Sequence, residues 1–185
     1  MALLWAFWFM IPAYVPNPAA AIVGGGRPID GGKCCKDGRR IFGDGKTWRG
    51  LIGGIAIGIL FGLLQMWLVD FFNLDFLPKH TLFTIIPLAV GALLGDLVKS
   101  FFKRRLGKES GSSWPIADMY DLVIGSLILL VLTILVTGNI GWIAETFVNV
   151  WWGLIVFIVI LGLSPLIHRG ANIIGYASGL KDVPW

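Results

Sequence analysis

The stretch LIGGIAIGILFGLLQMWLV, residues 51–69, contains no charged side chain. A helix needs about 20 predominantly apolar residues to cross the hydrocarbon core of a bilayer. This stretch therefore predicts a transmembrane helix, and the rest of the chain has a matching composition. Of its 185 residues, 56% are hydrophobic and only 14% are charged, whereas a soluble domain carries about 25% charged residues.

Four more segments share this character, so the predicted spans lie at about residues 2–23, 51–70, 81–102, 119–137 and 146–168. The first segment lacks the positive n-region and the cleavage site of a secretory signal, so we expect it to stay as a span. The sequence therefore predicts an all-α integral membrane protein, in which residues 1–185 form one membrane-embedded domain with five transmembrane helices.

The basic residues are distributed unevenly between the two sides of these spans. Fourteen of the 15 Lys and Arg residues fall on one side, and Lys79 alone falls on the other. By the positive-inside rule, the N-terminus lies outside, and two polar loops, residues 24–50 and 103–118, lie in the cytoplasm with the C-terminus. Anchoring explains the bases, but it does not explain the glycines and aspartates among them.

The first loop reads GGGRPIDGGKCCKDGRRIFGDGKTWRG, residues 24–50. Glycine lets a backbone approach a phosphate closely, successive N–H groups form anion-binding nests, and Lys and Arg add charge. The alternative is a flexible linker, although Ile41, Phe42 and Trp48 are unusual in one. We expect the adjacent Cys34 and Cys35 to form neither a disulfide nor a zinc site.

The second polar stretch, residues 95–121, reads GDLVKSFFKRRLGKESGSSWPIADMYD. Asp96, Lys99, Ser100 and Lys103 recur at spacings of three and four, so they share one face of a helix. An ionisable group in an apolar run is costly, which makes Asp96 a functional candidate. The alternative for Asp96 is a structural ion pair with Lys99 or Lys103.

Asp118 and Asp121 are three residues apart at the start of the fourth span. Carboxylates at this spacing project together and can hold a divalent cation, while capping of the helix is the alternative. In the first span, Asn17 stands between two prolines. It is expected either to hydrogen-bond a ligand headgroup or to cap a helix that begins at Pro18. His168 is expected to be structural or interfacial.

Residues 100–121 resemble the signature of the CDP-diacylglycerol synthases. The matching residues are Ser100, Lys103, Arg104, Lys108, Glu109, Asp118 and Asp121. The chain departs from that signature at Glu109, where the family has Asp, and in having Ser-Ser-Trp-Pro in place of His-Gly-Gly before the final aspartates.

The whole chain resembles the archaeal branch, the CDP-archaeol synthases. The matching segments are residues 16–18, 28–32, 37–50 and 184–185. The resemblance implies a five-span enzyme that uses Mg²⁺ and transfers CMP from CTP to 2,3-bis-O-geranylgeranyl-glycerol 1-phosphate, releasing pyrophosphate.

We assign expected roles on the residue types and on this resemblance. The expected catalytic residues are Asp96, Lys103, Asp118 and Asp121, and the three aspartates are also the expected Mg²⁺ ligands. The expected substrate-binding residues are Asn17, Asp30, Arg39, Arg40, Asp44, Lys46, Thr47, Arg49, Ser100, Arg104 and Lys108. A phosphate monoester is mostly a dianion at neutral pH, so the acceptor needs no general base.

The expected partners are CTP, a geranylgeranyl glycerol phosphate lipid and the bilayer, with no nucleic acid. The sequence leaves the oligomeric state open, and a homodimer is one alternative. A membrane prenyltransferase is a rival function, but it normally carries two separated Asp-rich motifs, and only one Asp pair here is suitably spaced. A transporter or channel is a second rival, and it predicts internal repeats that the sequence lacks.

Overall fold

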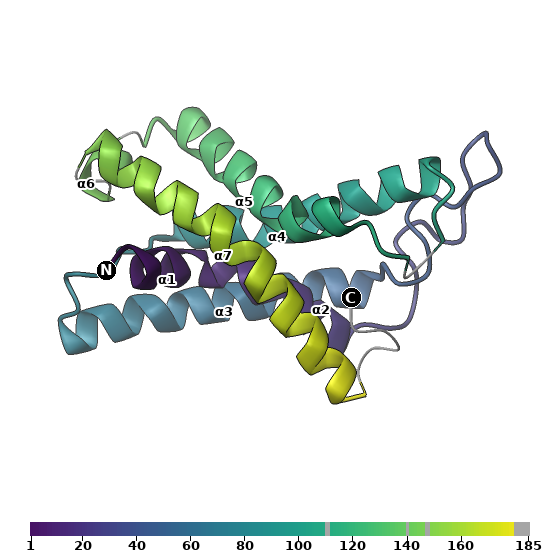
Figure 1. The fold of residues 1–185 in the computed structure, drawn as a ribbon, viewed down its shortest axis with the longest axis horizontal. Helices are drawn as coiled ribbons and strands as arrows, with labels where there is room; N and C mark the ends of the chain where they lie inside the picture. Colours follow the sequence, from purple (N-terminus) through teal and green to yellow (C-terminus); the bar gives the residue numbers. More distant parts are fainter. Residues whose placement is uncertain (110–111, 140, 147–148, 180–185) are drawn as a thin grey trace.

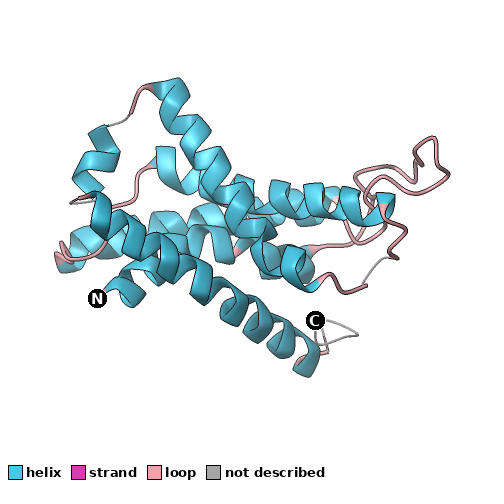
Figure 2. Ribbon diagram, turned by 45° about the horizontal axis from the view of Figure 1, so that its top comes forward, coloured by secondary structure: helices cyan, strands magenta, loops and turns pink. Residues whose placement is uncertain are grey.

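The chain is all-helical in a computed structural model (Figures 1 and 2). The structure describes residues 1–109, 112–139, 141–146 and 149–179. Its helices are α1 (Ala2–Tyr14), α2 (Pro16–Val23), α3 (Trp48–Phe72), α4 (Leu82–Arg105), α5 (Pro115–Thr137), α6 (Gly141–Thr146) and α7 (Val150–Ala177). Within the described residues, five segments are long and apolar enough to cross a membrane: α1 with α2, then α3, α4, α5 and α7. The predicted number of spans is confirmed.

The helix ends differ from the predicted ones for local reasons. Helix α3 begins at Trp48 because the Thr47 side chain caps it by accepting the Gly50 N–H at 3.1 Å. Helix α5 begins earlier than predicted, with Pro115 in its first turn, where the missing proline N–H costs nothing. Helix α7 continues to Ala177, nine residues beyond the predicted end of the last span at residue 168. The short helix α6 was not predicted.

The first span is interrupted where its prolines fall. Pro12 lacks the N–H that would bond to the Trp8 carbonyl one turn earlier. The Gln65 side chain of α3 donates to that carbonyl instead, at 2.8 Å. Helix α2 begins at Pro16 after Val15, with no side-chain cap. The alternative that Asn17 caps a helix beginning at Pro18 is therefore wrong.

Helices α4 and α5 form the closest pair in the bundle, and glycines allow it. A Cβ atom built on Gly125 of α5 would lie 2.8 Å from the Gly95 Cα of α4, and one built on Gly91 would lie 2.6 Å from the Ser126 Cα. The Ser126 hydroxyl donates to the Leu88 carbonyl at 2.8 Å. Small residues at such spacings let membrane helices pack backbone to backbone.

We predict that Gly125→Ala lowers the stability of the protein by about 1–3 kcal/mol, because the added methyl group overpacks the α4–α5 contact. Gly162→Ala on α7 is the matched control, since a Cβ there meets no atom within 4 Å. That substitution should instead stabilise slightly, as Gly→Ala does in an open helix position. Thermal denaturation in detergent measures both. Equal melting temperatures for the two variants would contradict the packing described here.

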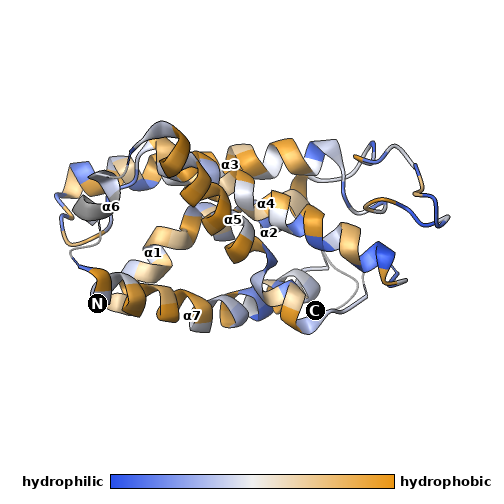
Figure 3. Ribbon diagram, turned by 90° about the horizontal axis from the view of Figure 1, so that it is seen from above, coloured by the Kyte–Doolittle hydropathy of each residue, from blue (hydrophilic) through white to orange (hydrophobic). Residues whose placement is uncertain are grey.

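The long helices are apolar along most of their length, and hydrophilic residues gather toward the ends of the bundle (Figure 3). The most extended hydrophilic segment is the loop of residues 24–47, which projects beyond the helices at the end opposite to the N-terminus (Figure 1). Helix α7 crosses the bundle at an angle and packs mainly on α1 and α5. The loop and the adjacent ends of α4 and α5 carry the polar residues singled out above.

Candidate functional site

Three carboxylates, those of the buried Asp96 and Asp121 and of the half-buried Asp118, surround one ammonium group between α4 and α5. The Lys99 Nζ lies 3.1 Å from Asp96 Oδ1, 3.1 Å from Asp118 Oδ1 and 2.6 Å from Asp121 Oδ2. Asp96 and Lys99 are three residues apart on α4, as Asp118 and Asp121 are on α5. The two pairs face each other because Gly95, beside Asp96, packs against the backbone of Asp121. We call these four residues the aspartate–lysine cluster.

A second lysine extends this cluster by one helical turn. The Lys103 Nζ lies 2.7 Å from Asp118 Oδ1 and donates to the Ser112 carbonyl at 2.8 Å. The other carboxylate oxygen of Asp118 accepts the Trp114 N–H at 2.7 Å. Asp118 thus satisfies a donor at the start of α5, as the capping alternative predicts, and also faces the cluster. Ser100, which is also an expected site residue, is buried on α4.

The glycine-rich loop reaches the cluster through Lys46. The Lys46 ammonium forms an ion pair with Asp96, so that carboxylate contacts two lysines. The loop backbone holds Lys46 in place, because its carbonyl accepts the Ile29 N–H at 2.8 Å and its N–H donates to the Gly43 carbonyl at 3.2 Å. The alternative predicted for Asp96 was a structural ion pair with Lys99 or Lys103. Asp96 does pair with Lys99, and its second partner is Lys46.

Asp30 organises the loop from inside. Its side chain is fully buried and accepts the N–H groups of Gly32, Phe42 and Gly43, at 3.0–3.1 Å. Arg40 donates to both of its oxygens. Burial by itself would raise the pKa of Asp30, but these hydrogen bonds hold that pKa well below its usual 3.8. The loop is therefore a folded unit, and the flexible-linker alternative is wrong.

We predict that Asp30→Asn opens this loop, because the buried N–H groups and Arg40 lose their shared anion. Hydrogen bonds to a charged group contribute about 1.5–3 kcal/mol each. Since the folded-state pKa is depressed, the stabilisation is complete above pH 3.8 and is lost as the pH falls through the lower folded value. Hydrogen exchange at neutral pH should show faster exchange at Phe42 and Gly43. Unchanged protection at those amides would contradict the role of Asp30.

Two arginines attach this loop to the end of α4. The Arg39 guanidinium donates to the Arg105 carbonyl at 2.7 Å. Arg105 donates to Asp37 at 2.6 Å and to the carbonyl oxygens of Arg39 and Arg40. The link brings residues 37–40 and 105 together across 65–68 positions of sequence. Arg105 was not among the expected site residues.

Four more expected site residues, Arg104, Lys108, Asp44 and Arg49, are half-buried or exposed. Arg104 donates to the Lys108 carbonyl at 2.5 Å, and Lys108 donates to the Ser113 carbonyl at 3.3 Å. Asp44 is exposed and pairs with Arg40. Arg49 is exposed on the first turn of α3. The expected C-terminal match at residues 184–185 lies outside the described residues.

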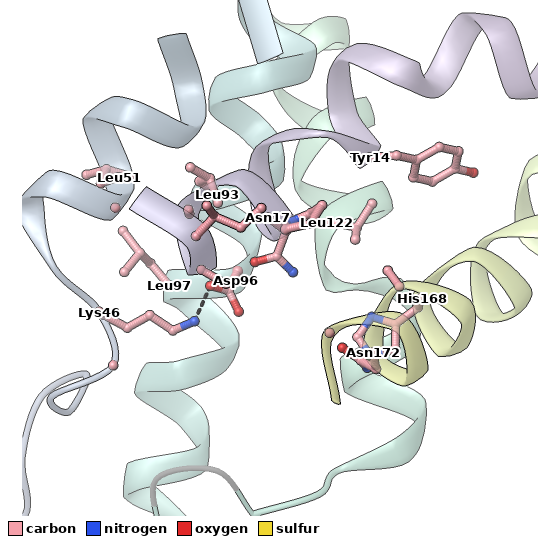
Figure 4. A pocket seen from close by; sticks show the side chains of 18 of the residues that line it. Tyr14, Asn17, Lys46, Leu51, Leu93, Asp96, Leu97, Leu122, His168 and Asn172 are labelled. Atoms are coloured by element: carbon pink, nitrogen blue, oxygen red, sulfur yellow. Dashed lines mark hydrogen bonds and ion pairs between the residues drawn. The ribbon is translucent and has the colours of Figure 1, made fainter. Parts of the chain in front are cut away.

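A cavity of about 430 Å³ opens beside the cluster. Lys46, Thr47 and Asp96 form one wall, and α2 contributes a second wall that includes Asn17. The third wall is the C-terminal half of α7. Figure 4 shows Asn17 and His168 pointing into this space from opposite helices. The extension of α7 beyond residue 168 thus builds part of the cavity.

The described residues contain no group of three His, Cys, Asp or Glu side chains arranged to hold a metal ion. The three carboxylates of the cluster nevertheless converge on one cation, the Lys99 ammonium. Their donor atoms are all carboxylate oxygens, the ligands that Mg²⁺ prefers. These oxygen ligands therefore suit Mg²⁺ chemically. In this structure the Lys99 ammonium lies between the three carboxylates.

The family model described as CarS-like, CDP-archaeol synthase, matches residues 1–185. The chain belongs to the CDP-archaeol synthase family. It is 67% identical over 176 residues to a CDP-archaeol synthase of Methanocorpusculum labreanum, a match that covers 95% of this chain and 100% of the relative. It is 56% identical to a CDP-archaeol synthase of Methanosphaerula palustris, with the same coverage.

A solved structure described as an intramembrane enzyme for archaeal membrane lipid biosynthesis has a similar fold. The TM-score is 0.69 with 32% sequence identity, and the match covers 92% of this chain and 94% of that one. Membership of the CDP-archaeol synthase family makes the chain an enzyme of archaeal lipid biosynthesis. The resemblance found in the sequence is thereby confirmed.

The structure brings together the expected residues Asp96, Lys103, Asp118, Asp121 and Lys46, and places Asn17 at the adjoining cavity. It keeps Asp30, Arg39 and Arg40 in contacts that order the loop, so their assignment to substrates stays a prediction. Lys99, at the centre of the cluster, was treated only as an ion-pair partner of Asp96. Its spacing from Asp96 and the neighbouring pair on α5 were the available signals.

Proposed function

We propose that this chain transfers CMP from CTP to 2,3-bis-O-geranylgeranyl-glycerol 1-phosphate, giving CDP-archaeol and pyrophosphate. The aspartate–lysine cluster carries the proposal, because its carboxylates pair with Lys99 and with two further lysines, Lys103 and Lys46, next to a cavity lined by α2 and α7. Nucleotidyl transfer to a phosphate requires this combination of metal ligands and fixed cations, since the reacting groups are all anions.

The reaction needs charge neutralisation and alignment more than proton transfer. An oxygen of the lipid phosphate forms the new bond to the α-phosphorus of CTP. The bond from that phosphorus to the oxygen bridging to the β-phosphate breaks, and its electron pair leaves with pyrophosphate. Lys103, Arg104 and Lys108 hold the triphosphate and balance the charge that develops on the leaving group. Asp44, Lys46, Thr47 and Arg49 contribute the loop side of the site.

Asp96, Asp118 and Asp121 are the residues that would hold Mg²⁺, which supplies positive charge to the phosphate oxygens when bound. Lys99, whose ammonium now lies between these carboxylates, has a flexible stem of four carbons that would let it give up this position. Lys99 compensates the charge of these three carboxylates, since uncompensated charge between helices is costly.

The site faces the cytoplasm of the archaeal cell in this proposal, with the chain as a multi-pass protein of the cell membrane. The bases of the loop of residues 24–47 and of the end of α4 support that orientation through the positive-inside rule. The same side of the membrane contains CTP. Figure 1 places the loop at the end of the bundle opposite to the N-terminus, consistent with an N-terminus outside.

The test is nucleotide transfer by the purified protein in detergent, with radiolabelled CTP and a geranylgeranyl ether phosphate. We expect labelled CDP-lipid and pyrophosphate in equal amounts, and little transfer from ATP, GTP or UTP. Phosphatidic acid serves as the comparison acceptor, and a prenyl diphosphate offered in place of CTP serves as the comparison donor. Transfer that fails with CTP but occurs with a prenyl diphosphate would replace the proposal with the prenyltransferase alternative.

A further inference from the structure

The cavity beside Asp96 differs in charge from the rest of the site. Among the described residues that line it, Lys46 is the sole Lys or Arg. Lys103, Arg104 and Lys108 do not line it. A triphosphate carries about four negative charges and needs several cations, whereas a phosphate monoester carries about 1.5–2. One lysine therefore suits a monoester better than a nucleotide triphosphate.

The mouth of the cavity is apolar. Ile22 of α2 and Ile174 of α7 both line it, and they are 62% and 69% exposed. Neighbouring residues on α7 are also exposed and apolar, including Leu166 and Ile173. In a membrane protein, exposed apolar side chains on a spanning helix face the lipid chains. The cavity therefore opens between α2 and α7 toward the hydrocarbon part of the bilayer.

Between this mouth and Lys46, three side chains make the cavity polar. Asn17 extends from α2, and His168 and Asn172 occupy successive turns of α7 (Figure 4). The Asn172 amide nitrogen and His168 Nε2 lie 2.7 Å apart. The two side chains are thus within hydrogen-bond distance of each other. Asn172 is buried, at 5% exposed, and Asn17 and His168 are half-buried.

We propose that Asn17, His168 and Asn172 form the subsite for the polar head of the lipid acceptor. The phosphate lies toward Lys46 and Asp96, the glycerol oxygens lie along the three side chains, and the isoprenoid chains leave between Ile22 and Ile174. This inference rests on the proposed function. It separates the two substrates, with the acceptor on the α2–α7 side of Asp96 and the nucleotide on the side of Lys103.

The test compares Michaelis constants for the two substrates in Asn172→Leu and His168→Leu variants. We expect the KM for the lipid phosphate to rise about ten- to a hundredfold, as when a hydrogen bond to a charged or polar ligand is lost. The KM for CTP should stay the same. Ile173→Ala is the matched control, because Ile173 is adjacent, exposed and outside the cavity lining.

A further variant covers the case in which replacing Asn172 or His168 with Leu prevents folding. Ile174→Trp adds bulk at the exposed mouth and should raise the KM for the lipid without changing that for CTP. Native mass spectrometry of the protein with the lipid phosphate, in the absence of CTP, reports binding directly, and the variants should retain less lipid. If the wild-type protein shows no transfer from CTP, the proposed function is overturned. The lipid-binding measurement still tests the subsite in that case.

Two results would overturn the subsite. One is a rise in the KM for CTP with an unchanged KM for the lipid, which would make this cavity part of the nucleotide site. The other is lipid retention and KM values like those of the Ile173→Ala control in all the cavity variants.

Discussion

Replacing Asp121 with Asn is expected to reduce CTP-dependent release of pyrophosphate by about a hundredfold or more, while the protein still folds. Asparagine keeps the shape of the side chain and removes one negative charge from the cluster. The Asp121 carboxylate is 2% exposed and lies 2.6 Å from the Lys99 ammonium, so no solvent replaces its charge. Losses of about this size follow when a fixed electrostatic contact to the transition state is removed.

The measurement is the initial rate of pyrophosphate release at saturating CTP and lipid, with Mg²⁺ varied. If Asp121 holds Mg²⁺, the Mg²⁺ concentration needed for half-maximal rate should rise as well. Asp75→Asn is the matched control, since Asp75 is 73% exposed and pairs with Lys79 in the segment between α3 and α4. Wild-type rates in Asp121→Asn at every Mg²⁺ concentration would exclude this carboxylate from the reaction.

The second large effect is expected on stability. Lys99→Met removes the cation shared by three carboxylates, leaving Asp96 with Lys46 and Asp118 with Lys103. Asp121 then has no basic partner in the described part of the chain. Removing one partner of a buried ion pair costs about 3–5 kcal/mol, because the other charge stays buried. We therefore expect Lys99→Met to unfold at a clearly lower temperature in detergent.

A double substitution separates this cause from simple misfolding. Lys99→Met combined with Asp121→Asn should recover part of the lost stability, because the uncompensated charge is then absent. Lys79→Met is the control. The Lys79 side chain is 63% exposed, so its ion pair with Asp75 should contribute little to stability. A Lys99→Met protein with wild-type thermal stability would show that the cluster does not depend on this lysine.

The sequence predicted the five spans because hydrophobicity and length determine which segments can cross a membrane. It did not predict the end of α7, since His168 and Asn172 resemble the polar end of a span. In the folded protein these residues face a cavity, so the helix continues through them. Polarity alone does not distinguish a helix that leaves the membrane from one that turns a polar face inward.

The candidate site was predicted in its composition and less well in its arrangement. The spacing of Asp96 and Lys99 showed that they share a face of a helix. This face lies against Asp118 and Asp121 because Gly95 packs on the backbone of α5. Such packing depends on how two helices are placed, which the spacing within one helix does not predict. The roles of Asp30 and Arg105 depend likewise on contacts between distant segments.

The interruption of the first span has a consequence for how the protein enters the membrane. Its Trp8 carbonyl is freed by Pro12 and is bound by Gln65 of α3. A backbone carbonyl left unpaired in hydrocarbon costs several kcal/mol. While the ribosome is still synthesising the chain, the first span lacks this partner. We expect it to stay beside the insertion machinery until α3 emerges, so that the two helices pass into the lipid as a pair.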